Sequence, residues 1–243
     1  MLRSLDVSLA NLQTDYVDLF YLHMWDFMTP VEEVMRGLDD LVRSGRVRYI
    51  GISDTPAWVV SKANMLAELR GWSRFVASQF PYSLASRDPE RDIIPMSRAD
   101  DLAMCVWGIL GGGSLTGKYS DPDATKRYKG VSEERQALGE RVAAMAAEIG
   151  CTPSQLAISW VRQRPGTGAP IVPILGARSL EQLTDNLGAL EFQLSDEQIA
   201  ELDTFSPVDL GFPHDFLRDS NVENLIFGKT LPLTDNHRDF LWR

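Results

Sequence analysis

Chemically useful side chains stand at the ends of five short apolar segments of the chain. They are His23 with Trp25, Ser53 with Asp54, Gln79, Trp107 with Gly108, and Gly176 with Arg178. Parallel α/β proteins bind ligands at the carboxyl ends of their strands. An imidazole, an amide and a hydroxyl–carboxylate pair would suit a flat heteroaromatic ring that carries a carboxamide and stacks on an indole. The pattern indicates a site for such a ring.

Each of these residues also has a structural interpretation. A single histidine at a strand end, such as His23, is more often a satisfied structural residue than a catalytic one. Trp107 alone fits a core position better than a stacking platform. Ser53 and Asp54 precede Thr55-Pro56 and could serve only as turn and cap residues. The residue types alone therefore leave both interpretations open.

The glycine-rich stretch from 111 to 119, GGGSLTGKY, is the first candidate for phosphate binding. Gly112, Gly117 and Lys118 match the spacing of the phosphate-binding loop (P-loop) of nucleoside triphosphatases, but Tyr119 stands where a serine or threonine would ligate magnesium. A loop of this composition can still surround the pyrophosphate of a dinucleotide. The second candidate is the helix start at Ser179, because a helix N-terminus attracts anions and Arg178 precedes it. An ordinary helix cap with a solvated arginine is the alternative.

Apolar runs that alternate with amphipathic stretches predict repeated βα units and a parallel sheet. Nearly continuous apolar composition predicts strands that are buried on both faces. The five predicted strands are Val17–His23, Val47–Ser53, Phe75–Tyr82, Ala103–Leu110 and Ile171–Leu175. Helix starts are predicted at a Thr29-Pro30-Glu32 capping box, at Thr55-Pro56, Thr152-Pro153-Gln155, Ser179-Gln182 and Ser195-Gln198, with an extra helix pair near 133–164. Five units fit either an open doubly wound sheet or an incomplete (β/α)8 barrel.

After residue 205 the pattern changes. Proline and glycine interrupt any helical period between 206 and 243, so we expect a tail without a βα unit. Its aromatic and aliphatic residues predict that it packs on the barrel portion, residues 1–205.

Composition excludes several function classes. The formal net charge of −10 argues against a nucleic-acid-binding protein, which needs clustered lysine and arginine. The two cysteines form no metal or disulfide pattern. No apolar stretch reaches the length of a membrane span, and the N-terminus lacks the apolar core of a signal peptide. A small-molecule enzyme of the cytoplasm is the expectation, without metal, nucleic acid or membrane.

Residues 1 to 217 resemble the aldo-keto reductase superfamily, in particular its fungal aryl-alcohol-dehydrogenase-like branch, which includes polyketide-pathway reductases. The resemblance rests on SLANLQTDYVDLFYLHMWD, GLDDLVRSGRVRYIGISDTPAWVVSKAN, SQFPYSL, RDIIPMSR, VWGILGGGSLTGKY and VPILGARSLEQLTDNLGAL. It implies a TIM-type barrel that binds NADPH without a Rossmann fingerprint.

The resemblance also assigns the site residues. It places His23 at the active-site histidine, Ser53, Asp54 and Gln79 at the nicotinamide carboxamide, and Trp107 on the nicotinamide ring. Gly108, Leu110, Gly112 and Lys118 fall at the pyrophosphate, and Gly176, Arg178, Gln182, Asp185 and Asn186 at the adenosine end. Trp25, which follows His23, is expected in the substrate pocket.

Three departures from the family pattern have consequences. Asp54 replaces an asparagine, so an ionised side chain can accept from the carboxamide NH2 but cannot donate to its oxygen. Gly108 replaces a hydroxyl residue. The sequence also begins where the family's third βα unit ends, which indicates an N-terminally truncated barrel. The family's proton-donating tyrosine, its lysine and its aspartate would lie before residue 1, and such acid catalysis contributes ~10²- to 10⁴-fold.

The sequence therefore predicts an oxidoreductase of secondary metabolism that reduces an aromatic or polyketide-derived aldehyde or ketone with NADPH. Loss of the tyrosine segment predicts impaired reduction, with His23 as the one recognisable catalytic residue. The alternatives are a non-redox isomerase, dehydratase or cyclase that reuses the pocket with His23, a non-catalytic binding protein, and an incomplete gene product. Five parallel strands leave two open edges, so we expect a homo-oligomer.

Overall fold

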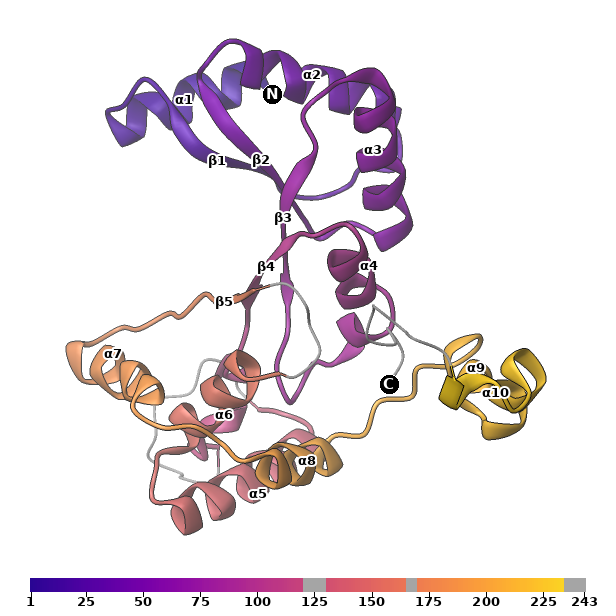
Figure 1. Cartoon of the computed structure of the whole chain (residues 1–243). Helices are drawn as coiled ribbons and strands as arrows, with labels where there is room; N and C mark the ends of the chain where they lie inside the picture. The colour runs from indigo at the N-terminus through magenta and orange to yellow at the C-terminus, as the bar shows by residue number, and fades with distance from the viewer. Residues whose placement is uncertain (120–129, 165–169, 234–243) are drawn as a thin grey trace. The chain divides into compact units, whose positions relative to one another are not determined.

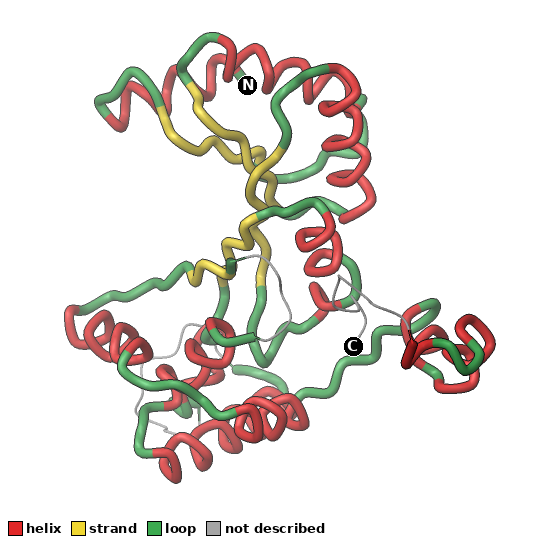
Figure 2. The backbone as a smooth tube through the Cα atoms, viewed as in Figure 1, coloured by secondary structure: helices red, strands yellow, loops and turns green. Residues whose placement is uncertain are grey.

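The computed structural model describes residues 1–119, 130–164 and 170–233. It divides into two compact units, which are described separately. Unit 1 contains Met1–Phe80, Met96–Cys105 and Gly168–Val172, and unit 2 contains Pro81–Pro95, Val106–Thr167 and Pro173–Arg243. Figure 1 labels the elements of both units, and Figure 2 distinguishes strands from helices.

One five-stranded sheet has the strand order β1-β2-β3-β4-β5. The strands are β1 (Val17–Leu22), β2 (Val47–Ser53), β3 (Phe75–Pro81), β4 (Ala103–Trp107) and β5 (Ile171–Pro173). The β1–β2 and β2–β3 pairs run parallel. A doubly wound sheet reverses its order at a switch point, whereas a barrel keeps neighbouring strands in sequence order. The order therefore confirms the predicted α/β class and agrees with part of a (β/α)8 barrel.

Unit 1 builds its core between β2 and the helices that flank it. Its helices are α1 (Leu2–Leu12), α2 (Val31–Arg43) and α3 (Ala57–Arg70). α2 packs against both α3 and β2. Met35, Leu38 and Ile50 are fully buried. Between α3 and β3, the buried Asn64 accepts a hydrogen bond from the Phe75 backbone N–H at 2.9 Å, which fixes the start of β3.

Unit 2 consists mainly of helices that surround a glycine-rich turn. They are η1 (Asp88–Glu90), η2 (Gly111–Thr116), α5 (Glu133–Ile149), α6 (Pro153–Arg162), α7 (Leu180–Leu187), η3 (Gly188–Leu190) and α8 (Asp196–Phe205), and α4 (Ile93–Ala99) begins at the unit boundary. α5 packs on η2 and α6, and α6 packs on α7. The capping boxes predicted at Thr152 and Ser195 are both formed. Ser179 also caps α7 as predicted.

The described part of the tail after α8, up to residue 233, contains three short helices where the sequence indicated no helical period. They are α9 (His214–Arg218), α10 (Ser220–Phe227) and η4 (Leu231–Leu233). Arg91 donates to the carbonyl oxygens of Asp209 at 2.7 Å and Leu210 at 3.2 Å, which fastens the start of the tail. Phe212 and Leu225 are more than four-fifths exposed. Packing of the whole tail on the barrel portion stays a prediction, and residues 234–243 lie outside the described residues.

Other predictions were wrong in detail. The expected capping box at Thr29 does not form, because the Asp26 carboxylate accepts the backbone N–H groups of Met28 and Thr29 and the Thr29 hydroxyl. α2 begins at Val31 with no side-chain cap. β4 stops at Trp107, three residues early, because Gly108 has a left-handed backbone with φ 72°. β1, β3 and β5 also end early, at Leu22, Pro81 and Pro173.

Burial of the strands on both faces was also predicted wrongly. Leu19 and Tyr49 are register partners in β1 and β2, and they are 37% and 58% exposed. Strands of a closed barrel would bury such apolar side chains in its interior. One face of the β1–β2 pair is therefore partly open to solvent in this chain. No helix of the described residues is both long and apolar enough to cross a membrane.

Candidate functional site

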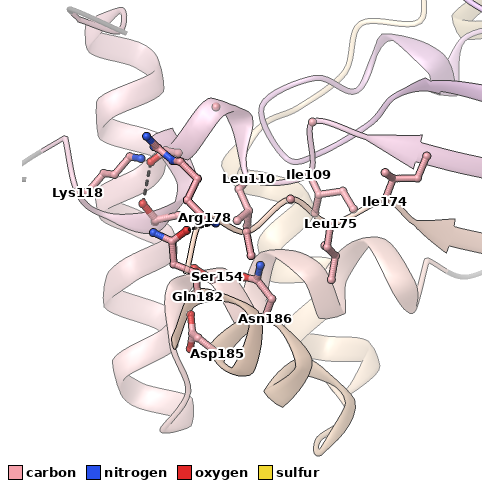
Figure 3. A pocket seen from close by; sticks show the side chains of 16 residues that line it. Ile109, Leu110, Lys118, Ser154, Ile174, Leu175, Arg178, Gln182, Asp185 and Asn186 are labelled. Carbon is pink, nitrogen blue, oxygen red and sulfur yellow. Dashed lines mark hydrogen bonds between the residues drawn. The ribbon is translucent and has the colours of Figure 1, made fainter. Parts of the chain in front are cut away.

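Unit 2 contains a cavity of about 560 Å³, a size typical of small-molecule sites. Loop residues after β4, η2, the first turn of α6, and the segment from 174 into α7 line it. Nine residues that the sequence assigned to a cofactor meet there: Gly108, Leu110, Gly112, Lys118, Gly176, Arg178, Gln182, Asp185 and Asn186. In Figure 3, Lys118 and Arg178 lie at one end of the cavity, and Ile109, Ile174 and Leu175 lie at the other. The cavity thus has a cationic end and an apolar end.

Glycines form the wall around η2. Gly112 and Gly113 adopt left-handed backbones, with φ values of 67° and 96°, which side chains rarely tolerate. The Lys118 side chain covers Gly113 so closely that an added Cβ would lie 2.2 Å from its Cε. The loop therefore brings backbone and an ammonium group to the cavity without intervening side chains. That is the arrangement a phosphate needs for close approach to the chain.

The α7 wall combines a helix N-terminus with a cation and an amide. Ser179 accepts the backbone N–H of Gln182, and Gln182 Oε1 accepts the N–H of Arg178 at 2.9 Å. This exchange holds Arg178 at the positive end of the helix dipole, where an anion is stabilised. Asn186 is only 4% exposed yet contributes to the cavity lining. An amide in that position can read the polar edge of a ring.

The α6 start is a part of the cavity wall that sequence reasoning missed. Ser154 in its first turn lines the cavity. Asp185 Oδ1 accepts from the Thr152 hydroxyl at 2.8 Å and from Gln155 Nε2 at 3.2 Å. Asp185, assigned to the ligand alone, therefore also fastens α7 to the start of α6. The capping signal at Thr152 located the helix, but nothing in the sequence indicated which cavity it faces.

Unit 1 holds the other predicted polar residues, around the ends of β1, β2 and β3. His23 Nε2 lies 3.8 Å from Asp54 Oδ2, and the histidine side chain is 69% exposed. Ser53 and Gln79 are register partners, and the Asp54 N–H donates to the Gln79 carbonyl. Ser53 is 3% exposed, and its hydroxyl has no hydrogen-bond partner among the described residues. A buried hydroxyl without a partner is costly, so an unfilled hydrogen-bonding role at this position is indicated.

Two aromatic residues complete the set that the sequence singled out. Trp107 ends β4 in unit 2, directly before Gly108 of the cavity wall, and is 40% exposed. Trp25 lies half-buried in unit 1, in the loop between β1 and α2. Trp107 is thus not the core residue that its apolar surroundings in the sequence allowed. Its indole face is accessible for stacking.

Tyrosines near these groups are poor candidates for a proton donor. The Tyr21 hydroxyl lies against Cys105 and Gln79 in unit 1, and burial together with the Cys105 thiol raises its pKa well above the usual range. Burial and the Glu90 carboxylate likewise raise the pKa of Tyr82. A general acid works best with a pKa near the operating pH. Neither phenol meets that requirement. The described part of the chain also holds no cluster of metal-ligating side chains.

Comparison with known proteins identifies the chain. The model of the aldo/keto reductase family matches residues 1–207. This protein belongs to the aldo/keto reductase family. Its relatives include the norsolorinic acid reductase of Aspergillus flavus, 40% identical over 222 residues, which is 91% of this chain and 56% of the relative. A probable aryl-alcohol dehydrogenase of Saccharomyces cerevisiae is 38% identical over 222 residues, 87% of this chain and 67% of the relative. The norsolorinic acid reductase B of Aspergillus parasiticus is 37% identical over the whole chain, which spans 63% of its length.

These findings confirm the family and the branch to which the sequence was assigned. The 243 residues of this aldo/keto reductase span little more than half the length of several of the curated relatives they match. The matched region includes all thirteen residues assigned to the cofactor, as well as His23 and Trp25. What the full-length relatives act on therefore bears on this chain only as a proposal.

Proposed function

We propose that this aldo/keto reductase binds NADP(H) and belongs to an enzyme that interconverts an aromatic or polyketide-derived carbonyl compound and its alcohol. The observation that carries the proposal is the cavity of unit 2, in which nine residues assigned to the cofactor come together. The resemblance to the family assigns those residues to the pyrophosphate and to the adenosine end of the cofactor. Two of the relatives are named for reducing norsolorinic acid and one for dehydrogenating aryl alcohols, which supports the substrate class.

The cavity fits the phosphate-bearing part of a dinucleotide. Lys118 and the left-handed glycines of η2 would hold the pyrophosphate through charge and close backbone approach. Arg178, beside the start of α7, would hold a phosphate on the adenosine ribose, and Asn186 with Gln182 would meet the adenine. A planar guanidinium grips phosphate in two-point geometry. A preference for NADPH over NADH would follow from this arginine.

Unit 1 carries side chains that fit the nicotinamide. The hydroxyl of Ser53, buried and without a partner among the described residues, would find that partner in the carboxamide. Asp54 would accept a hydrogen bond from the carboxamide NH2, and the Gln79 side chain would also hydrogen-bond to the carboxamide. Trp107, considered by itself in unit 2, carries the indole that the family resemblance assigns to stacking on a nicotinamide. When bound, the nicotinamide supplies or accepts hydride.

His23 is the residue of these 243 that we propose for carbonyl polarisation, because its exposed imidazole can donate a hydrogen bond to a substrate oxygen. The resemblance to the family assigns none of these 243 residues to the family's catalytic tyrosine, lysine or aspartate. We therefore propose that the 243-residue chain on its own binds the cofactor better than it catalyses reduction. The alternatives are non-redox chemistry at His23 and cofactor-independent binding.

Titration with NADPH, followed by its fluorescence, tests the proposal. Trp107→Ala and Lys118→Ala should each weaken binding, because one removes stacking area and the other a charge at the pyrophosphate; each loss is on the order of 5- to 100-fold. Arg178→Ala should weaken NADPH more than NADH. Lys62→Ala, an exposed charge removal on α3 of unit 1, is the matched control and should leave the affinity unchanged. Equal affinity in the wild type, Trp107→Ala and Lys118→Ala would overturn the cofactor assignment.

A further inference from the structure

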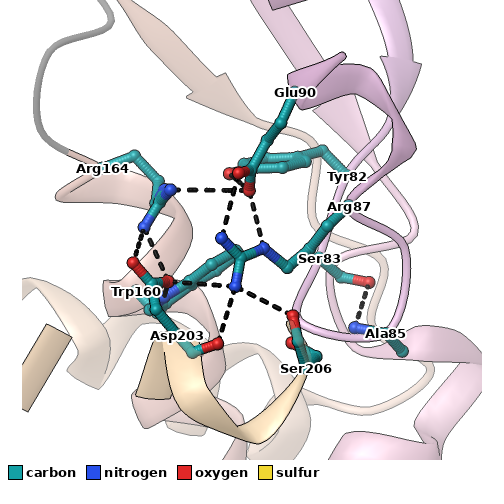
Figure 4. Close-up of polar contacts among 9 residues, drawn as sticks. All are labelled: Tyr82, Ser83, Ala85, Arg87, Glu90, Trp160, Arg164, Asp203 and Ser206. Atoms are coloured by element: carbon teal, nitrogen blue, oxygen red, sulfur yellow. Dashed lines mark hydrogen bonds and ion pairs between the residues drawn. The ribbon is translucent and has the colours of Figure 1, made fainter. Parts of the chain in front are cut away.

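Four charged residues of unit 2, three of them largely buried, form a cluster that the cofactor assignment does not use. Arg87 and Glu90 belong to the segment after β3, Arg164 follows α6, and Asp203 lies in α8; we call these four residues the clasp (Figure 4). The side chains of Arg87, Arg164 and Glu90 are 9%, 13% and 17% exposed, and that of Asp203 is 32% exposed. Charged groups are rarely this buried unless they are paired.

Every member of the clasp has several partners. Arg87 donates two hydrogen bonds to the Glu90 carboxylate, at 2.7 and 3.0 Å, and also donates to the backbone carbonyl oxygens of Asp203 and Ser206. Arg164 donates hydrogen bonds to both carboxylate oxygens of Asp203, each at 2.7 Å. The two guanidinium groups lie 5.4 and 4.8 Å from the ring centre of the fully buried Trp160. A buried polar network that is satisfied in this way holds its members rigidly.

Glu90 joins both ends of one short segment, from Tyr82 to Arg87. Its Oε1 accepts from the Tyr82 hydroxyl at 2.8 Å and from Arg87 Nε at 2.7 Å. Between these ends, Ser83 and Ser86 exchange two backbone hydrogen bonds, of 3.1 and 2.9 Å, and close a tight turn. The Tyr82 ring also packs on Trp160, with centroids 5.3 Å apart. Side chain and backbone together thus fix the conformation of residues 82–87.

The other side of this segment contacts the cofactor wall. The Tyr82 backbone N–H donates to the Trp107 carbonyl at 3.1 Å. An added Cβ on Gly111 would lie 3.4 Å from Ala85 Cβ, and one on Gly108 would lie 4.0 Å from Pro81 Cβ. The chain from 81 to 85 therefore lies against Trp107, Gly108 and Gly111. Those residues include the proposed stacking aromatic and the start of the glycine loop.

Helix α6 connects the clasp to the opposite wall of the cavity. Its first turn carries Ser154 of the lining, and its cap residue Thr152 holds Asp185 of α7. Its last turns carry Trp160, whose indole N–H donates to Asp203 at 3.0 Å. A helix is a rigid connector over ten residues. The clasp can therefore fix both walls of the cavity, although none of its four members lines it.

We propose that the clasp is a positioning device of this enzyme: through the segment 81–87 and α6 it holds Trp107 and the glycine loop in the conformation that binds the dinucleotide. This inference rests on the proposed function, but it assigns a role in the site to residues outside the cavity. Its members are positioning residues, because they act through Trp107, Gly108 and Gly111 rather than on the ligand.

Two variants and one control test the inference. Tyr82→Phe removes only the hydroxyl that reaches Glu90, and its ring can stay on Trp160, so this variant should fold. Glu90→Gln keeps an acceptor for Tyr82 but removes the charge between the two arginines. Asp39→Asn is the control, because Asp39 is a buried carboxylate of unit 1, bonded to Arg43 and Ser73 and outside the proposed site.

Two measurements are made on each folded variant. Hydrogen exchange of the cofactor-free chain follows the amides of Gly111, Gly113 and Leu115, whose hydrogen bonds close the glycine loop. NADPH titration gives the affinity. We expect both clasp variants to speed exchange at these amides and to weaken NADPH binding by on the order of 2- to 10-fold, the range for one ordinary intramolecular hydrogen bond. Asp39→Asn should lower the melting temperature without either effect.

A purely structural clasp gives a different result. Tyr82→Phe and Glu90→Gln would then lower the melting temperature, as Asp39→Asn does, while loop exchange and NADPH affinity stay at wild-type values, and the inference would be overturned. A wild-type chain that binds no NADPH would refute the proposed function instead. In that case loop exchange alone decides: faster exchange in the clasp variants upholds control of the loop, and unchanged exchange refutes it.

Discussion

Gly139→Ala should destabilise this protein although it improves a helix. Gly139 lies in the middle of α5, where α5 packs against η2. A Cβ at this position would lie 2.2 Å from the Ser114 carbonyl oxygen, whereas ordinary contact begins at 3.4 Å. The obstacle is backbone, so no side-chain rotation can relieve it, and α5 and the glycine loop must separate by about 1 Å.

Two effects of opposite sign decide the magnitude. Alanine in place of glycine inside a helix contributes about 1 kcal/mol of propensity. Overpacking a close contact costs about 1–3 kcal/mol, and more where the backbone has to move. We expect the steric cost to exceed the propensity gain, for a net loss of about 2 kcal/mol. In a chain of this size that corresponds to a fall of about 4–8 °C in Tm.

Gly37→Ala is the matched comparison. Gly37 also lies inside a helix, α2, but its added Cβ would meet only the flexible end of Met1, at 3.2 Å. The propensity gain should dominate there and raise Tm by about 1–4 °C. Thermal unfolding followed by circular dichroism measures both variants. If Gly139→Ala raises Tm as much as Gly37→Ala does, the close packing of α5 on η2 is not real, and the reasoning fails.

Three further outcomes are expected. Asp39→Asn should lower the free energy of unfolding by about 1–3 kcal/mol at neutral pH. Burial opposes ionisation of Asp39, but the Ser73 and Arg43 hydrogen bonds hold its pKa below the usual value. The ionised carboxylate therefore stabilises the fold above about pH 4, and this stabilisation is lost as the pH falls further. Denaturant titrations at pH 7 and pH 3 that show the same difference from wild type would contradict this. Light scattering after size exclusion should report at least a dimer, and deletion of the residues after Phe205 should cause aggregation. The reason is that the β1–β2 face and the tail expose large apolar side chains. A compact monomer that tolerates the deletion would refute this prediction. NADPH oxidation by the 243-residue chain with aromatic aldehydes should be far slower than the ~10 s⁻¹ typical of enzymes. Any residual rate should fall in the His23→Ala variant. A rate typical of enzymes would contradict the prediction and would require a proton donor other than Tyr21 or Tyr82.

The sequence predicted the elements that depend on short-range signals. Strand β2 was predicted with its full bounds, and the caps at Thr152, Ser179 and Ser195 were located, because a capping residue bonds a backbone group three positions away. The same logic failed at Thr29, where a competing local acceptor, Asp26, was not recognised. Helix α1 has no side-chain cap, so its start gave no comparable signal.

Predictability of the site follows the same division between local and long-range contacts. Five of the nine lining residues stand out in the sequence itself, at strand ends or in the glycine-rich loop: Gly108, Gly112, Lys118, Gly176 and Arg178. Leu110, Gln182, Asp185 and Asn186 were assigned to the cofactor only by the resemblance to the family. The bonds from Arg87 to the Asp203 and Ser206 carbonyl oxygens join residues 116 and 119 positions apart, and Thr152 and Asp185 are 33 apart. No periodicity encodes such pairs. A residue at a strand end or in a glycine-rich loop can thus be singled out from its neighbours in the chain, whereas one that holds the cavity wall from behind can be inferred only from the fold.

That division has a consequence for how this aldo/keto reductase tolerates change. Under the proposed function, a cation in the cavity wall such as Lys118 or Arg178 would act on the ligand directly, so its replacement should alter binding with little effect on folding. Arg87 and Arg164 lie behind the wall, and each is nine-tenths buried or close to it, so removal of either leaves carboxylates and carbonyls buried without their partner. Loss of such a partner is strongly destabilising, by about 3–5 kcal/mol, a large part of the ~5–15 kcal/mol that stabilises a typical domain. Substitutions at the clasp should therefore affect stability and cofactor affinity together, and this coupling distinguishes them from substitutions in the cavity itself.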